Sequence, residues 1–497
     1  MTGTRPLAHP ATATGDDVAV LDLVTDLAMG LRTAGVRYCH WKSNAAIDRS
    51  LTGDNDLDLL VAPDDAGRFL SVLYGLGFRA ATPPPGRYVP GILDLFGLDD
   101  PTGRVVHAQA HFRLPVGDDM TKNVVLPFAD AYLDSCADQG HVLPLPSVAH
   151  EYLVLVLRLG LKHCALSSQL VGQGRSTATE RRELAHLEAR VDPAEVERLR
   201  ASHLPTVPAP LLAEVRAALE PDAGRRVRAH AGRRLLRALA PYTRRSLPRD
   251  LVLRIAKRAW LPVRGRLPGG DPRRRPLAGG LLVAVIGGDG AGKSTTVARL
   301  TDTLGVGFVT RTAHLGKPPR SLPGRLARRV VRTVVGATPV IVPEDAPPGR
   351  FPGYGTLLWL VLLARDRARE QRRLHRAVAR GEVVVCDRYP VPGLRTMDGP
   401  RAARFPGVAQ RPLARWLADV EARRYRHMPR PDLSLVLRVS PEVAVTRRPE
   451  QDRAFVWRRA AEVQGLAWTG ADVVVVDADR PEEAVQRAAA RAVWDRL

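Results

Sequence analysis

The chain has 497 residues, enough for two or three domains, and 45% of them are hydrophobic, which allows sizeable cores. Aromatic residues make up only 5%, so these cores must be built mainly from Leu, Val and Ala. The net charge of +22 is concentrated, because 225–275 holds 17 basic residues, 16 of them Arg, against 2 Asp, a difference of +15. This charge is only weak evidence for nucleic acid, because no pattern of interleaved aromatic residues supports stacking on single strands, so nucleic acid is not expected as a partner.

Cysteine usage and hydropathy favour a cytoplasmic protein. The four cysteines, Cys39, Cys136, Cys164 and Cys386, form no CxxC pair and show no metal-ligand spacing, as expected in a reducing compartment. Residues 1–15 lack a basic start followed by an apolar core, so no signal peptide is expected. The longest apolar runs are far too short to span a bilayer.

The region 16–146 is expected to form a first domain. Asp56 and Asp58 alternate around a leucine, ahead of the apolar run 59–61, and this pattern predicts a buried strand. Because residues i and i+2 share one face of a strand, both carboxylates can approach the same divalent metal ion. A polar turn at Ser43 lies about a dozen residues before Asp56.

This arrangement resembles the nucleotidyltransferase superfamily. The preceding His-Trp-Lys-Ser-Asn sequence is also similar to a group of uncharacterised bacterial nucleotidyltransferase-like domains. The resemblance implies an α+β fold in which Asp56 and Asp58 hold Mg²⁺. The expected third carboxylate is missing, because the later strand offers His107, Gln109 and His111 instead. Three interpretations stay open: an active nucleotidyltransferase, the same fold used only for binding, and a solvated acidic edge.

Two connecting regions follow this domain. We expect 147–240 to be a helical extension and 241–278 to be a basic linker rich in Pro and Arg. Within them, 229–239 and 251–260 have the pattern of basic amphipathic helices. Such helices suit peripheral contact with an anionic membrane surface. Alternatively, they dock on the protein and leave a solvated arginine face.

The region 279–497 alternates strands and helices, which favours a parallel α/β sheet. An apolar run, 281–286, predicts a buried strand that ends in the pattern Gly-x-x-x-x-Gly-Lys-Ser, followed by a helix. In that context backbone amides and the helix N-terminus can cradle phosphate groups, whereas the alternative is a plain glycine-rich turn. We expect further strands at 308–310, 382–389, 433–439 and 473–476, with helices at 356–380 and 481–494.

Five pieces of this region, in order, resemble thymidylate kinases. They are the loop Gly288-Asp-Gly-Ala-Gly-Lys-Ser-Thr295, the helical sequence Ala364-Arg-Asp-Arg-Ala368, the strand 381–389 ending in Asp387-Arg388-Tyr389, the strand and turn 431–444, and the arginines that follow, Arg447 and Arg448. The resemblance implies a three-layer P-loop kinase fold that uses ATP and Mg²⁺ and transfers a phosphoryl group to a small-molecule acceptor.

The resemblance also implies site residues. Lys293 and the loop would bind the ATP phosphates, with Gly287, Asp289, Gly290, Gly292, Ser294 and Thr295 as the other loop positions. Ser294 and Asp387 would hold Mg²⁺. Asp289, Arg367 and Arg388 would face the acceptor, although Arg367 can equally be a surface arginine. Arg447, Arg448 or Arg453 would close over the transferred group, and this division of roles suits phosphoryl transfer.

The acceptor half of this resemblance is incomplete. Thymidylate kinases carry an Arg-Glu-Pro-Gly-Gly motif after the second strand, whereas this chain has only Arg311 and then a long segment, 320–354, without a counterpart. The sequence therefore supports the ATP half of a kinase site better than the thymidylate half. It favours a kinase whose acceptor is a dTMP-like nucleoside monophosphate or another small molecule with a phosphate or hydroxyl group. A nucleotide-sensing protein and a bifunctional nucleotidyltransferase-kinase remain the alternatives.

Overall fold

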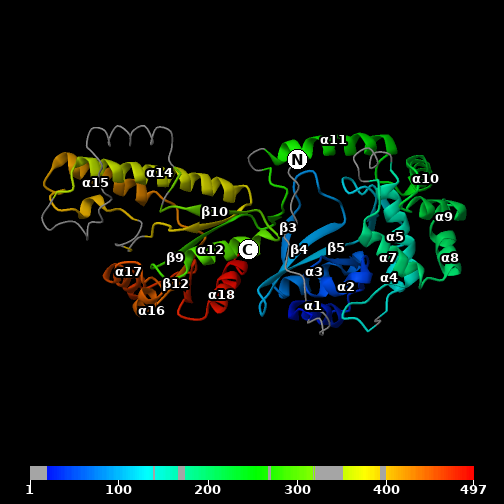
Figure 1. Ribbon diagram of the computed structural model, residues 1–497, viewed down its shortest axis with the longest axis horizontal. Helices are drawn as coiled ribbons and strands as arrows, with labels where there is room; N and C mark the ends of the chain where they lie inside the picture. Colours follow the sequence, from blue (N-terminus) through cyan, green and yellow to red (C-terminus); the bar gives the residue numbers. More distant parts are fainter. Residues whose placement is uncertain are drawn as a thin grey trace.

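The computed structural model describes residues 20–137, 140–165, 174–266, 270–316, 318–319, 351–391, 394 and 399–497. These residues form two lobes that lie side by side (Figure 1). The N-terminal lobe contains a mixed sheet and the C-terminal lobe a parallel sheet, so the chain is a mixed α/β protein. Within the described residues, no helix is both long and apolar enough to cross a membrane.

The N-terminal sheet has six strands in the order β1-β2-β5-β4-β3-β8. Only β2 and β5 run parallel, and the other neighbours are antiparallel. The strands are β1 (Tyr38–His40), β2 (Leu57–Val61), β3 (Arg79–Thr82), β4 (Ile92–Asp99), β5 (Arg104–His111) and β8 (Arg275–Pro276). Leu57, Leu59 and Val61 belong to one core with helices α1 (Asp22–Thr33) and α3 (Ala66–Gly75). The period of two therefore turns Asp58 and Leu60 to the opposite face.

A helical layer covers that opposite face. Its core joins Leu60 and Trp41 to the helices that follow the sheet. Those helices are α4 (Ala129–Asp134), α5 (Val148–His163), α7 (Ala178–Glu188), α8 (Pro193–His203), α9 (Ala209–Ala218) and α10 (Arg225–Ala238), and α2 (Ile47–Leu51) follows β1. The hairpin β6 (Leu114–Val116) and β7 (Val124–Leu126) belongs to the same core. Helix α5 is buried over most of its length and forms the centre of this layer.

The stretch expected as a linker contains a helix and a strand. Helix α11 (Leu247–Gly265) contains the predicted helix 251–260 but begins earlier and continues through Pro262. Its polar side faces the protein: Arg254 pairs with Asp250 at 2.8 Å, and Arg258 pairs with Asp118 at 2.6 Å. The expectation of a docked helix with a solvated arginine face is wrong for these two arginines, because buried carboxylates attract them inward.

The C-terminal sheet has five parallel strands in the order β10-β11-β9-β12-β13. They are β9 (Leu281–Gly287), β10 (Thr310–His314), β11 (Val383–Asp387), β12 (Leu433–Arg438) and β13 (Val473–Asp477). The helices are α12 (Lys293–Gly305), α14 (Tyr354–Ala379), α15 (Pro412–Arg426), α16 (Pro441–Thr446), α17 (Arg453–Gly465) and α18 (Glu482–Trp494). Strand β9 lies at the centre of the sheet, so the loop after it lies between the ends of two neighbouring strands.

The second strand of this sheet lies further along the chain than predicted, at β10 instead of 308–310. Phe308 is fully buried and packs against Phe96 of the N-terminal sheet, with ring centroids 5.2 Å apart. Phe308, which was predicted to begin a strand, therefore packs in the contact between the two lobes. Arg274, just before β8, also forms a bridge to Phe308.

The two lobes share one hydrophobic core. Phe96, Leu98 and Val105 of the N-terminal sheet belong to the same buried cluster as strands β9, β11 and β12. Trp494 closes this contact: its indole N–H donates to the carbonyl of Gly77 at 2.9 Å, and its own carbonyl accepts from Arg79 at 3.2 Å. Because buried apolar side chains continue across the contact, the lobes pack as one unit.

Candidate functional sites

The glycine loop between β9 and α12 lies at the carboxyl edge of the parallel sheet. Every residue of β9 is buried, as the apolar run predicted. Gly290 and Gly292 both have a φ of 84°, a left-handed conformation that side-chain-bearing residues rarely adopt. A Cβ on Gly290 would lie 2.7 Å from the carbonyl oxygen of Ala444 in α16. The loop can therefore follow this path only with glycine at that position.

Lys293 lies across this loop. Its side chain is buried, and its Nζ donates to the carbonyl oxygen of Gly288 at 2.6 Å. Burial lowers the pKa of Lys293 to about 8, and Arg388 nearby acts in the same direction. An anion such as a phosphate would offset both effects, so the position favours an anionic ligand.

Asp289 lies between two arginines. Arg388 donates to Oδ1 at 3.1 Å and Arg459 donates to Oδ2 at 2.8 Å. Burial acts in the opposite direction, but Arg459, Lys293 and Arg388 together lower the pKa of Asp289. Arg388 itself has a φ of 57°, an uncommon conformation for a residue with a side chain. The structure thus brings together Asp289 and Arg388, which the sequence assigned to one site.

Arg459 was missed by the sequence interpretation, which looked for arginines only between 447 and 453. It lies on α17 among the buried residues Val456, Ala460 and Val463. A signal was present, because this spacing puts an arginine on the apolar face of a helix. A buried guanidinium needs a carboxylate partner, and Asp289 is that partner.

Asp387, Ser294 and Thr295 are the residues available to a metal ion. Asp387 is buried at the end of β11, and its Oδ1 has no hydrogen-bond partner among the described residues. Ser294 and Thr295 are exposed in the first turn of α12. A buried carboxylate oxygen without a hydrogen-bond partner, at the same sheet edge as exposed hydroxyls, is the oxygen chemistry that Mg²⁺ prefers, so the residues fit this ion. The described residues contain no cluster of three His, Cys, Asp or Glu arranged for a metal, so water and phosphate would supply the other ligands.

The other predicted arginines lie in different settings. Arg447 donates to the carbonyl of Ala478 at 2.9 Å and reaches that of Gly290 at 3.5 Å, so it borders the glycine loop. Arg448 is oriented toward Glu450, 3.3 Å away. Their closure over a transferred group stays a prediction.

Arg367 is buried rather than presented on the helix surface. It donates to the carbonyl of Leu315 at 2.8 Å and to the hydroxyl of Tyr425 at 2.5 Å. The alternative of a surface arginine is therefore wrong. These contacts tie α14 to the segment after β10 and to α15, and a direct contact with an acceptor stays a prediction.

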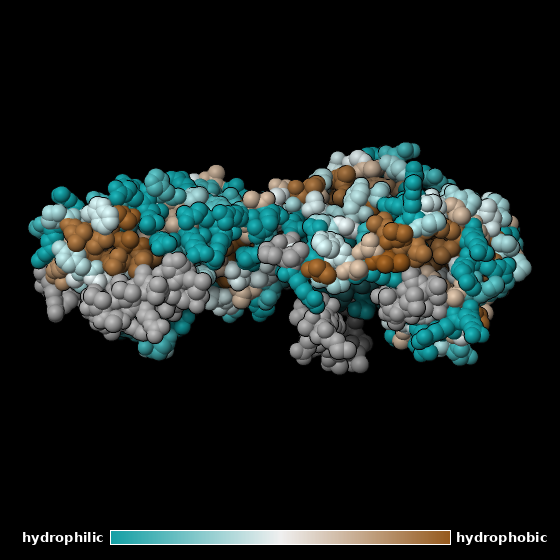
Figure 2. Space-filling model, turned by 90° about the horizontal axis from the view of Figure 1, so that it is seen from above, coloured by the Kyte–Doolittle hydropathy of each residue, from teal (hydrophilic) through white to brown (hydrophobic). Residues whose placement is uncertain are grey.

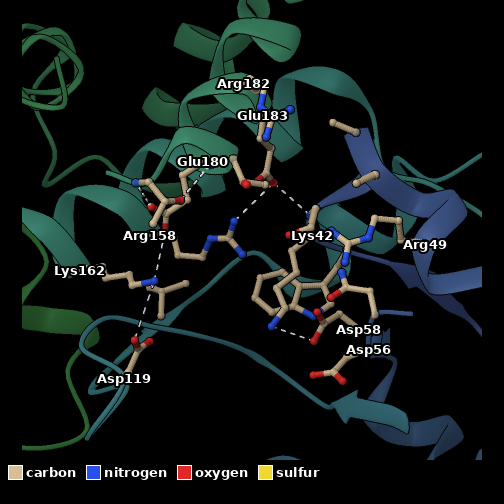
Figure 3. A pocket seen from close by; sticks show the side chains of 18 of the residues that line it. Lys42, Arg49, Asp56, Asp58, Asp119, Arg158, Lys162, Glu180, Arg182 and Glu183 are labelled. Atoms are coloured by element: carbon tan, nitrogen blue, oxygen red, sulfur yellow. Dashed lines mark hydrogen bonds and ion pairs between the residues drawn. The ribbon is translucent and has the colours of Figure 1, made fainter. Parts of the chain in front are cut away.

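A large cavity lies in the N-terminal lobe, between the sheet and the helical layer. Its volume is about 700 Å³. Figure 3 shows side chains from α5 and α7, among them Arg158, Lys162 and Glu180, around the same space as Lys42 and Asp58. A cavity of this size accommodates an organic ligand of the size of a nucleotide or a sugar phosphate.

The two predicted metal ligands lie at this cavity and are engaged by cationic or imidazole groups. Lys42 Nζ lies 2.8 Å from Asp58 Oδ1, and His107 Nδ1 lies 2.7 Å from Asp56 Oδ1. Burial acts in the opposite direction, but Lys42 and then His111 hold the pKa of Asp58 well below its usual range. A role of Asp56 and Asp58 as metal ligands stays a prediction.

An acid does accompany His107 and Gln109, but it comes from the neighbouring strand β4. Asp94 pairs with Gln109 in the strand register and accepts hydrogen bonds from the Gln109 amide and from His107, both at 3.0 Å. Arg274, which precedes β8, lies 2.9 Å from its other oxygen. Asp94 lines a separate, smaller cavity and not the large one. It therefore acts as an internal counter-ion at the junction between the lobes.

The fold and these sites define an α/β protein whose C-terminal lobe carries a phosphate-binding type of loop. No protein-family model matches the chain. Among curated proteins, it is 28% identical to the uncharacterised ATP-binding protein YghS of Escherichia coli strain K12, over 43% of this chain and 92% of that protein. It is 26% identical to YghR, another uncharacterised ATP-binding protein of that strain, over 43% of this chain and 86% of the relative.

A thymidylate kinase is also among the similar proteins. The enzyme of Alcanivorax borkumensis is 29% identical over 43% of this chain and 96% of its own length. These relatives support an ATP-binding, kinase-like region in the chain.

Proposed function

We propose that this chain is an ATP-dependent phosphotransferase of the thymidylate kinase type. It would transfer the γ-phosphoryl group of ATP to a phosphorylated small molecule, with dTMP or a similar nucleoside monophosphate as the first candidate, in the cytoplasm. One juxtaposition carries the proposal: Lys293 and Asp387 lie at the same sheet edge as the cluster of Asp289, Arg388 and Arg459. Phosphoryl transfer requires this combination of cations and a metal-binding carboxylate.

Each group has a role in this proposal. The loop amides and Lys293 bind the ATP phosphates, and burial strengthens the attraction of Lys293 for them. Ser294 and Asp387 would hold Mg²⁺, which neutralises charge on phosphate oxygens when it is bound. Arg388 faces the transferring group and is oriented by Asp289. Arg447, at the edge of the loop, and Arg448 would approach when the site closes.

Two alternatives remain, and one has an observation in its favour. An ATP-sensing protein would use the same loop without an acceptor. A bifunctional nucleotidyltransferase-kinase acting on a non-nucleotide metabolite would need a second site, and the 700 Å³ cavity beside Asp56 and Asp58 provides space for one. The segment 320–350, where the sequence departs from thymidylate kinases, lies outside the described residues.

A screen of acceptors with γ-labelled ATP tests the kinase proposal. We expect label transfer to one class of phosphorylated acceptor, dTMP included in the panel, and loss of turnover in Lys293→Ala. If no acceptor raises ADP formation above the basal rate while ATP still binds, the protein is a sensor and the kinase proposal is wrong. Asp56→Asn with Asp58→Asn tests the bifunctional alternative, which requires loss of nucleotidyl transfer with the kinase reaction intact.

A further inference from the structure

The charges on the wall of the large N-terminal cavity are not balanced. Its five carboxylates each lie near a cationic or imidazole group: Asp56 near His107, Asp58 near Lys42, Asp119 and Glu180 near Lys162, and Glu183 near Arg158. Three further cations line the same cavity, Arg49, Lys122 and Arg182. Among the described residues none of the three forms a close ion pair, although Asp54 lies near Arg49, and Asp58 and Asp119 lie near Lys122. The lining therefore holds six Lys and Arg side chains against five carboxylates.

These three cations come from separate elements. Arg49 lies on α2, Lys122 on the turn between β6 and β7, and Arg182 on α7. Lys122 is the most enclosed, and its burial, with Lys42 close by, lowers its pKa to about 8. Asp58 and Asp119 act in the opposite direction without cancelling this shift. An anion in the cavity would recover the remaining cost of holding the ammonium there.

The rest of the wall suits an organic group. Trp41, Pro115 and Val116 contribute apolar surface, while Ser43 and Thr179 add hydroxyl groups. A cavity of 700 Å³ with apolar walls and a few convergent charges is typical of a small-molecule site. Arginines from different elements suit the several oxygens of a phosphate group.

We propose that the N-terminal cavity is a second ligand site, which binds a phosphate-bearing small molecule directly through Lys122, Arg49 and Arg182. Lys42 lines the same cavity and its Nζ lies 2.8 Å from Asp58 Oδ1, so a cation of the chain already neutralises that carboxylate. This site does not depend on phosphoryl transfer in the other lobe. Its ligand class can therefore be tested in protein whose glycine loop is inactive.

Calorimetric titration of the full-length Lys293→Ala protein tests this site, because that change removes the main phosphate-binding side chain of the other lobe. The probes are pyrophosphate, dTMP and, as a carboxylate control, succinate, each with and without EDTA. We expect saturable binding of a phosphate compound that EDTA does not change. Arg182→Ala and Lys122→Met should each weaken it about tenfold, the loss expected for one charge-assisted hydrogen bond.

Arg113→Ala is the matched control, since Arg113 is an exposed arginine of the same lobe outside the cavity. Arg182 is also exposed, so its substitution should leave the fold intact, as circular dichroism can verify. Absence of saturable binding, equal affinity in Arg182→Ala and Arg113→Ala, binding that EDTA abolishes, or a preference for succinate would each overturn the proposal.

A different observation concerns helix α11, which has its apolar side toward solvent. Five large hydrophobic side chains are 44–68% exposed: Leu251, Val252, Ile255, Trp260 and Val263. Their spacing forms one stripe along the helix. Figure 2 looks down on the side that carries α11 and shows hydrophobic residues gathered over the N-terminal lobe.

Two contacts with the N-terminal lobe fix this orientation. Arg258 pairs with Asp118 at 2.6 Å, and Lys257 donates to the carbonyl of Met120 at 2.9 Å. Arg254 is also buried and pairs with Asp250 of the same helix. Exposed arginines stand near both ends of the stripe, Arg249 and Arg266. An apolar stripe with an interfacial tryptophan and flanking arginines is complementary to an anionic bilayer surface. We infer that α11 binds peripherally to such a surface.

Flotation of the full-length protein with vesicles tests this inference. We expect flotation with phosphatidylglycerol mixed into phosphatidylcholine, weak flotation with phosphatidylcholine alone, and loss of flotation in Ile255→Ser with Trp260→Ser. Trp416→Ser is the control, because Trp416 is 56% exposed in the other lobe. No flotation, or equal flotation of the double variant, would contradict the inference. A dimer in solution that the double variant abolishes, without flotation, would assign the stripe to a second copy of the chain.

Discussion

Arg459 Nη1 lies 2.8 Å from Oδ2 of Asp289, although 170 residues separate the two in sequence. The pair joins the helix α17 to the glycine loop, and both side chains are buried. It therefore helps to hold the carboxylate of Asp289 beside its second partner, Arg388.

Replacing Arg459 by Met should damage turnover more than ATP binding. The change leaves Asp289 with Arg388 as its remaining arginine partner, and removing one member of a buried pair costs about 3 kcal/mol of folding stability. We expect a lower kcat with a nearly unchanged Kd for ATP, measured by turnover and by calorimetry. Arg299→Met, an exposed arginine on α12, should change neither. Equal losses in both variants would show that Arg459 does not act through Asp289.

Lys293 predicts a pH dependence of ATP binding. Because its pKa in the folded protein is about 8, below the usual value of 10.5, the side chain loses its charge as the pH rises through 8. The affinity for ATP should fall above that pH. The stability of the ligand-free protein should rise between pH 8 and 10.5, since the unfolded chain binds the additional proton there. Titrations across this range test both trends, and Lys293→Arg, charged throughout, should flatten the affinity profile.

Gly290 and Gly292 offer a comparison within one loop. Both have the same φ, but a Cβ on Gly292 meets no atom within 4 Å, whereas one on Gly290 would collide with Ala444. Gly292→Ala should therefore cost about 1 kcal/mol from its backbone conformation alone. Gly290→Ala should cost clearly more, because α16 must also move. Chemical denaturation measures both costs, and similar values would show that the loop can move away from α16.

The strand, loop and helix from β9 to α12 could be predicted from sequence because their signals are local. The run of apolar residues, the glycines and the Lys-Ser pair lie within a few residues of one another. Asp387 and Arg388 could be placed for a similar reason, since a buried strand delivers both to the sheet edge.

Features that depend on distant partners could not be placed. Nothing in the sequence near Arg459 indicates its contact with Asp289. Asp94 becomes a counter-ion only because β4 pairs with β5 and because Arg274, distant in sequence, lies beside it in the fold. The orientation of α11 is another example. The sequence shows an amphipathic helix, but the inward position of Arg258 depends on Asp118, more than a hundred residues earlier. Contacts between residues distant in sequence thus determine the positions of these side chains, which the periodicity of the sequence cannot show.

Glu151 should make the stability of the N-terminal lobe depend on pH. Burial raises its pKa to about 7, although the backbone N–H of Asn44 donates to it at 3.2 Å and acts against that shift. A carboxyl group with a raised pKa in the folded state contributes its full stability below the unfolded value of 4.5 and loses it as the pH rises through 7. Glu151→Gln keeps the acceptor oxygen and removes the titration. We expect this variant to be more stable than the parent at pH 8, by up to about 3 kcal/mol, and similar to it at pH 4.5.

Thermal unfolding at the two pH values measures the difference, with Glu195→Gln as the control on a neighbouring helix. A parent protein whose stability is constant between pH 4.5 and 8 would mean that Glu151 stays ionised in the folded lobe.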